Sequence, residues 1–224
     1  QYAIKNLNDI KLWVPAREEI QTLKQLNALR NRLLTTKKQL EQVFTEKEFL
    51  SKENVKLLHN SVKKSLNAIK EDIKKTEKQM TEIITKDEEL LNQYKIITSV
   101  DGIGMFSAIE IIITTNEFKN INEAKKFACY AGVVPFDHSS GSSIKKRPKV
   151  SKMANQRVKS LLHMAALSAI NMKGELRDYF IRKVEEGKNK MCVLNAIRNK
   201  LVLRIFACIK NNRAYEKKYD FKLV

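Results

Sequence analysis

The sequence has little of what marks loop-rich, disulfide-linked or membrane-spanning proteins. Its 224 residues include only six glycines and three prolines, so few positions interrupt regular helical structure. No apolar run reaches the roughly 18 to 20 residues that cross a bilayer, and the chain does not start like a signal peptide. Cys129, Cys192 and Cys208 are isolated in apolar helical stretches, which predicts reduced core residues. We therefore expect a cytoplasmic protein with no membrane partner.

Acidic side chains are also scarce. The chain has 43 Lys and Arg against 25 Asp and Glu, a net charge of +18. Residues 101–224 hold 24 basic and 11 acidic side chains, and none of the residues from His138 to Lys173 is acidic. An excess of this size predicts a polyanionic partner, with nucleic acid as the best fit. The alternative is a lysine-rich solvated surface without a specific partner.

Apolar residues recur at helical spacing along most of the chain, which predicts a mostly α fold. One helix should begin near Ala16 and a second should span about 51–94. The second carries apolar residues in 4-3 alternation from Val62 to Tyr94, which is typical of a coiled coil. The two helices are predicted to form a long antiparallel coiled-coil hairpin. Such an arm either spaces two domains or pairs with another chain.

The composition changes near residue 95, just before the first glycines. We predict a linker over 1–15, the coiled-coil arm over 16–95 and a helical domain over 96–224. The interval 132–152 has neither helical nor strand period, and it is expected to be one long functional loop. The remaining helices of this domain are predicted at about 105–114, 121–131, 153–172, 175–186 and 189–211.

The stretch "VDGIGMFSA" (100–108) resembles a helix-hairpin-helix element. In that element, small residues such as Gly102 and Gly104 let backbone amides approach a phosphate without reading the base sequence. The alternative is a tight turn between two packed helices.

The stretch "HSSGSSIKKRPKVSKMAN" (138–155) combines serines and a glycine with five cations. A serine attacks a phosphodiester when a base removes its proton and cations stabilise the phosphoryl oxygens. Ser140 precedes Gly141, which leaves room for a close backbone approach, and His138 lies near enough to be the base. The alternative is a mobile basic loop. The cations within a dozen residues of this serine are Lys145, Lys146, Arg147, Lys149 and Lys152.

Neighbouring positions do not supply a metal site. Asp137 is the acid beside this stretch, and Asp101 and Glu110 lie well upstream. Two-metal phosphoryl transfer therefore cannot be assembled from adjacent residues. His59 falls in the predicted coiled coil and His163 on an apolar helix, so neither is expected to act on the serine.

These stretches resemble the C-terminal part of the IS110/IS1111-type transposases, also called the IS116/IS110/IS902 family. The resemblance rests on "SVDGIGMFSAIEI", "FACYAGVVPFDHSSGSS" and "VSKMANQRVKSLLHMAALSA". The family pattern there is a GIG turn, a YxGLxP-like segment, a Ser-Gly cluster and an SKxGNxxLRxxL helix. The opening "YAIKNLNDIKLWVP" is similar to the family's segment just after a RuvC-like domain.

The resemblance implies a DNA recombinase that cuts and rejoins strands through a covalent serine–DNA link during transposition. It also implies an upstream RuvC-like domain whose four acids bind a divalent metal, Mg. Because the chain begins at Gln1, we expect it to be a fragment without that domain, inactive by itself. Expected partners are DNA, a guide RNA and further copies of the chain, as a dimer or tetramer through the coiled coil. A nucleoid-associated bacterial protein is the implied setting.

Carried over residue by residue, the nucleophile falls on Ser140, with Ser139 as the fallback. Ala154 stands where the family commonly has glycine, and Lys159 where arginine is usual, which removes a bidentate phosphate clamp. The residues expected to contact nucleic acid are Gly102, Gly104, Lys145, Lys146, Arg147, Lys149, Lys152, Arg157 and Lys159.

Two other functions fit the sequence. A non-catalytic helix-hairpin-helix protein would grip DNA and oligomerise through its coiled coil, and it would respond to changes at Gly102 and Gly104 rather than at serines. A coiled-coil oligomerisation protein with a basic face would bind DNA weakly, and modest salt would abolish the binding.

Overall fold

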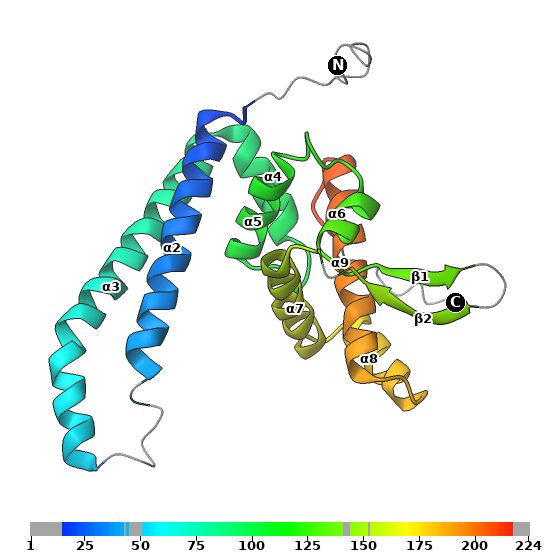
Figure 1. Ribbon diagram of the computed structural model, residues 1–224. Coiled ribbons are helices and arrows are strands. Elements are labelled where there is room, and N and C mark those ends of the chain that lie inside the picture. Colours follow the sequence, from blue (N-terminus) through cyan, green and yellow to red (C-terminus); the bar gives the residue numbers. More distant parts are fainter. Residues whose placement is uncertain (1–14, 43, 45–50, 141–143, 152, 217–224) are drawn as a thin grey trace, which may run out of the picture.

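The computed structural model describes residues 15–42, 44, 51–140, 144–151 and 153–216, with the side chains of all of these except 137–140 and 144–147. Within these residues the fold is mostly helical, which confirms the predicted class, with one two-stranded sheet (Figure 1). The elements are α2 (Glu18–Gln42), α3 (Lys52–Lys86), α4 (Glu88–Thr98), α5 (Met105–Thr115), α6 (Ala124–Tyr130), β1 (Pro135–Ser140), β2 (Ile144–Val150), α7 (Gln156–Asn171), α8 (Glu175–Glu185) and α9 (Lys190–Lys210).

Helices α2 and α3 lie side by side and run in opposite directions, and we call this pair the arm (Figure 1). Helix α3 begins after Ser51, whose hydroxyl accepts a hydrogen bond from the Asn54 amide. The predicted antiparallel pair is therefore present, while the knobs-into-holes packing of a coiled coil stays a prediction. The buried residues of α3 are Leu66, Ile73, Thr76, Met80 and Ile84.

The single helix predicted over 51–94 is wrong. The backbone of Asp87 is extended (φ −110°, ψ 116°), which ends α3. Its carboxylate accepts a hydrogen bond from the Leu90 amide at 2.9 Å and so caps α4. The apolar stripe continues across the break, because Leu90 is buried in the core of the next unit. The spacing of apolar residues therefore could not predict that α3 ends before Asp87.

Helices α4–α9 form one packed unit, which we call the body. Its centre is α9, which contacts α4, α6, α7 and α8 and is buried along most of its length. Its buried residues run from Val193 to Cys208, so α9 supplies a large part of the core. Among the described helices, none combines the length and hydropathy needed to cross a membrane.

The loop predicted over 132–152 is largely a β-hairpin, so that expectation is also wrong. Strands β1 and β2 pair antiparallel and project away from the helices (Figure 1). The second strand reads "IKKRPKV", with no apolar alternation and a proline, and such a sequence fits only an exposed edge strand. A two-stranded sheet has edge strands only, so Pro148 is tolerated.

The other helices lie close to their predicted positions, and the cysteines differ from prediction. Cys208 is buried as expected, but Cys129 is half-buried and Cys192 is exposed. Position 192 lies in the first turn of α9, before that helix enters the core.

An ion-pair network joins the arm to the body. Arg17, just before α2, donates to Asp87 at 2.8 Å and to both oxygens of Glu117 at 2.5 and 3.0 Å. These contacts raise the pKa of the Arg17 guanidinium and lower that of the Asp87 carboxyl. Glu117 is the middle residue of a left-handed turn over 116–118, with φ of 50°, 57° and 62°. Non-glycine residues adopt this conformation at a cost of roughly 1 to 2 kcal/mol each, so surrounding contacts hold the turn.

Candidate nucleic-acid interface

The hairpin brings the serine segment and the lysine segment together through its backbone register. Ser139 pairs with Lys145 and Ser140 with Ile144, near the outer end of the strands. The register shifts between Phe136 and His138, in the part of the hairpin that is nearer the body. The backbone of Ser140 is therefore placed on a projecting element, at the end remote from the helices (Figure 1).

The proposed nucleophile itself lies outside the described side chains. This applies to Ser140 and to the fallback Ser139, and residue 141 is outside the described residues altogether. The prediction of serine catalysis therefore stays a prediction.

One clamp ties the two ends of the hairpin to the body. The Asn155 amide donates to the Tyr130 carbonyl at 2.8 Å, and the Asn155 side-chain amide donates to the Tyr130 hydroxyl at 2.8 Å. The Asn155 Oδ1 also accepts from the Arg157 and Val158 amides and so caps α7. Tyr130 precedes the hairpin and Asn155 follows it. The contacts between these two residues therefore hold the two ends of the hairpin together. Sequence reasoning missed this pair, although an Asn before a helix is a recognisable cap signal.

A close approach between Gly132 and Ala154 lies beside the clamp. Gly132 has a left-handed backbone (φ +64°), and a methyl carbon built on it would lie 2.4 Å from Ala154 Cβ. The family's glycine position is thus filled here by a methyl group that fits because residue 132 has none. Ala154 itself is not among the left-handed residues.

The two glycines of the GIG turn have different surroundings. Gly102 (φ +86°) faces α7, and a methyl carbon there would lie 2.5 Å from the Ala165 carbonyl oxygen. Gly104, the N-cap residue of α5, has open space around it and no side-chain cap hydrogen bond. Packing is therefore enough to explain Gly102, while Gly104 leaves the amino end of α5 accessible. The helix-hairpin-helix interpretation stays a prediction.

Arg157 is held in place by a buried acid. Its guanidinium lies 2.7 Å from Glu110 Oε2, which also accepts from the Asn27 side chain at 2.7 Å. Glu110 is buried, whereas the Arg157 side chain is 41% exposed. A cation in the first turn of a helix is disfavoured by the helix dipole. The Glu110 carboxylate offsets that effect and orients the guanidinium.

The structure describes only some of the other cations that were predicted to contact nucleic acid. Lys149 is exposed on β2, and the Lys159 side chain is half-buried beside Gly132. Lys152 lies outside the described residues. The backbones of Lys145, Lys146 and Arg147 lie in β2, and their side chains are outside the description.

The described histidines make structural contacts. The His59 ring lies edge-on to Phe44, with centroids 5.4 Å apart. His163 Nδ1 lies 2.9 Å from a guanidinium nitrogen of the buried Arg198. Burial, and then the charge of Arg198, lower the pKa of His163. The side chain of His138, the suggested base, lies outside the described residues.

Across the part of the chain that the structure describes, no three His, Cys, Asp or Glu side chains gather as metal ligands would. These residues therefore do not form the divalent-metal site that the family resemblance implies.

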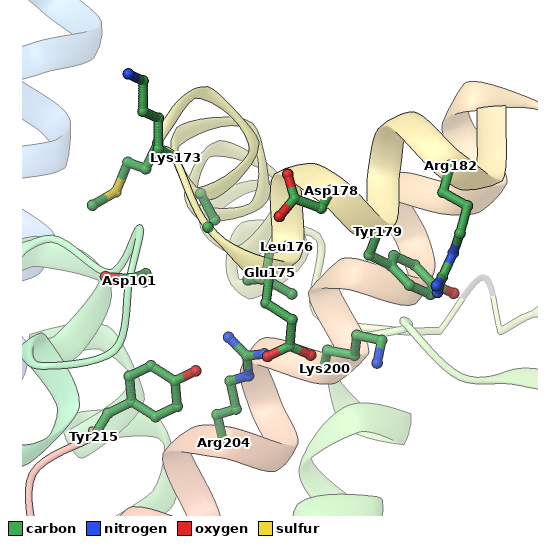
Figure 2. Close-up of a pocket in the computed structure, with 13 residues that line it drawn as sticks. Asp101, Lys173, Glu175, Leu176, Asp178, Tyr179, Arg182, Lys200, Arg204 and Tyr215 are labelled. Carbon is green, nitrogen blue, oxygen red and sulfur yellow. The ribbon is translucent and has the colours of Figure 1, made fainter. Parts of the chain in front are cut away.

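A cavity of about 750 Å³ lies between the α7–α8 connection, α9 and the segment after α9 (Figure 2). Glu175 and Arg204 point toward each other there and pair at 2.5 Å. The Lys200 ammonium lies 4.7 Å from the centre of the Tyr179 ring. Three acids, Asp101, Glu175 and Asp178, also line this cavity. Its mixed charge does not favour a polyanion.

Comparisons with known proteins find similarity over the segment that contains the hairpin. Residues 94–180 match the family described as Transposase IS116/IS110/IS902. The pilin gene-inverting protein of Moraxella bovis is 28% identical over 131 residues, which are 58% of this chain and 41% of that protein. The insertion element IS110 uncharacterized 43.6 kDa protein of Streptomyces coelicolor is 26% identical over 121 residues, 54% of this chain and 30% of that protein.

The chain thus spans less than half the length of the curated relatives it matches. The matched segment begins in α4 and ends in α8, so it contains the GIG turn, the hairpin and the Tyr130–Asn155 clamp. Residues 94–180 of this chain are accordingly similar to the IS116/IS110/IS902 transposase family.

Proposed function

We propose that the chain is the strand-handling part of a DNA recombinase that moves an insertion sequence, with Ser140 as its nucleophile and Ser139 as the fallback. One observation carries the proposal. The family match covers a projecting hairpin whose backbone register sets the serine segment against the lysine segment. The pilin gene-inverting relatives are named for inverting a gene. A gene is inverted by breaking DNA strands and rejoining them in the other direction.

The chemical step is a transesterification. The Ser140 hydroxyl oxygen attacks the scissile phosphorus, the bond from phosphorus to one sugar oxygen breaks, and a serine–phosphate ester forms. A base takes the hydroxyl proton, and the departing sugar oxygen receives one. Attack by a sugar hydroxyl on the ester reverses the step and joins a new strand. The number of phosphate ester bonds is unchanged, so rejoining requires no external energy source.

The charge of the chain supports this assignment. Its formal net charge is +18, and β2 carries four of the predicted phosphate-contacting cations: Lys145, Lys146, Arg147 and Lys149. Cations beside the scissile phosphate stabilise the charge that develops on its oxygens. They also attract DNA without regard to sequence.

We propose that an upstream RuvC-like domain of the complete recombinase binds the divalent metal, Mg. No step above passes through that metal. A guide RNA and self-association through the arm complete the proposal, and the protein would act in the bacterial cytoplasm at the nucleoid.

The test uses the complete recombinase. Ser140→Ala should abolish strand exchange and leave DNA affinity unchanged, because the hydroxyl is lost and the cations remain. Ser139→Ala tests the fallback, and it should retain exchange if Ser140 is the nucleophile. Mass spectrometry of the covalent protein–DNA adduct should map the link to the peptide that contains Ser140. An adduct on another residue, or full exchange by both alanine variants, would refute the assignment.

Gly104→Ala tests the non-catalytic alternative. The substitution meets open space, so the fold should be kept. If the chain only grips DNA through a helix-hairpin-helix element, this variant should lose affinity, and both serine variants should behave like the unchanged protein.

A further inference from the structure

A cleft lies where the arm meets the body, which we call the arm–body cleft. It consists of two adjoining hollows of about 440 Å³ each, which share Asn31, Thr35 and Arg157. It is open to solvent between α2 on one side and the amino-terminal parts of α5 and α7 on the other.

The lining of this cleft carries charge of one sign. It includes four cations, Arg30, Arg32, Lys38 and Arg157, and no Asp or Glu. The cavity of Figure 2 differs, because three acids line it and one of them pairs with Arg204. Of these two described sites, only the arm–body cleft has the electrostatic character that suits an anion.

Two of the four cations are fixed by partners behind the cleft. Arg157 is held by Glu110, and Arg30 pairs with Glu77 at 2.8 Å while its guanidinium carbon lies 3.2 Å from the centre of the Phe106 ring. Both acids lie outside the lining, so the guanidinium groups are oriented in advance. Preorganised donors of this kind lose less entropy when they bind an anion.

The other two cations are free to take a ligand. Arg32 and Lys38 are exposed, and neither takes part in an ion pair among the described residues. They stand six residues apart on α2, which is about 9 Å along the helix axis. The phosphates of one strand of a duplex rise by about 3.4 Å per nucleotide. The distance along α2 is therefore about 2.6 nucleotide rises, which separates phosphates two to three positions apart on one strand.

We propose that the arm–body cleft binds the phosphodiester backbone of a nucleic-acid strand, with Arg32 and Lys38 as the arm's contacts and Arg157 as the body's contact. The site is separate from the hairpin, but the two adjoin, because Arg157 follows the Asn155 clamp at the hairpin base. The arm then takes part in binding and is more than a spacer or an oligomerisation element. This inference rests on the proposed nucleic-acid function.

The experiment compares two double variants of equal charge. Arg32→Gln/Lys38→Gln removes the arm's contacts, and Lys63→Gln/Lys70→Gln removes two exposed α3 lysines that do not line the cleft. Fluorescence anisotropy against labelled random-sequence duplex DNA, its single strand and an RNA stem-loop gives each Kd over a range of salt. Circular dichroism melting verifies that both variants are folded.

The cleft variant should bind at least one probe about tenfold more weakly at about 0.1 M salt, and its log–log salt slope should be smaller by about 1 to 2. The control variant should change Kd by less than about threefold. A loss of affinity for only the DNA probes or only the RNA probe supports the site and identifies which nucleic acid it binds. If the cleft variant matches the control while the unchanged protein binds well, the cleft proposal alone is overturned. If the unchanged protein binds no probe, the proposed function fails as well.

Discussion

At the residue scale, the packing at the base of the hairpin requires that residue 132 has no side chain. Gly132 is left-handed and faces Ala154, so it is constrained both by its backbone and by its neighbour. Gly187 has a similar backbone (φ +83°) but open space around it. Comparing Gly132 with Gly187 therefore separates the cost of the left-handed backbone from the cost of the overlap with Ala154.

Gly132→Ala should lower the free energy of unfolding by about 2 to 4 kcal/mol, because the new Cβ combines left-handed strain with overlap. Gly187→Ala should cost only about 1 kcal/mol, from the backbone alone. Ala154→Gly added to Gly132→Ala should restore part of the loss. Urea denaturation measures all three, and equal losses for the two single variants would contradict the overlap.

At the element scale, the junction between α3 and α4 sets the direction of the arm. Asp87 breaks the helix, and Arg17 ties this break to the left-handed turn that follows α5. The Glu117 side chain is fully buried, and Lys119 contacts it from outside at 3.1 Å. The Phe118 ring packs edge-on against Phe206 on α9, with centroids 5.0 Å apart. Ionic and aromatic contacts thus hold the strained turn.

Arg17→Ala should lower the free energy of unfolding by about 2 kcal/mol, because a buried carboxylate loses its main hydrogen-bond donor. Lys119→Ala is the matched control, and it should cost less than about 1 kcal/mol because its contact is exposed. Chemical denaturation compares them. A smaller loss for Arg17→Ala than for Lys119→Ala would show that the guanidinium does not hold this junction.

Helix positions could be predicted from the sequence, whereas contacts between distant segments could not. Helix α5 was predicted at 105–114 and spans Met105–Thr115, because Gly104 and Asn116 mark its ends. The hairpin was not predicted, because its strands show no apolar alternation and the structure describes their pairing through the backbone. At the candidate site, Arg157 was predicted as a cation, but its Glu110 partner lies 47 positions away and only the fold brings them together.

At the scale of the whole molecule, the hairpin that we propose to contact nucleic acid lies outside the packed core that gives stability. The core is built from α4–α9 with residues of the arm. Of the described hairpin side chains, Pro135, Phe136, Pro148 and Lys149 are exposed and Val150 is half-buried. The fold therefore does not depend on burying the hairpin.

Replacement of residues 135–150 by a short Gly-Ser turn should change the free energy of unfolding by less than about 1 kcal/mol, because surface segments contribute little. DNA affinity should fall, and the log–log salt slope should shrink by up to about 3.6, about 0.9 for each of the four cations on β2. Thermal melting and anisotropy give the two readouts. A collapse of the fold, or unchanged affinity, would contradict this division.

The break at Asp87 has a geometric consequence for any assembly of this protein. Helix α3 has 35 residues and is about 52 Å long. A swing of about 10° at its base would displace its far tip by about 9 Å, since a long lever magnifies a small angle. Arg17, which contacts Asp87 at that base, therefore helps to set the position of the tip.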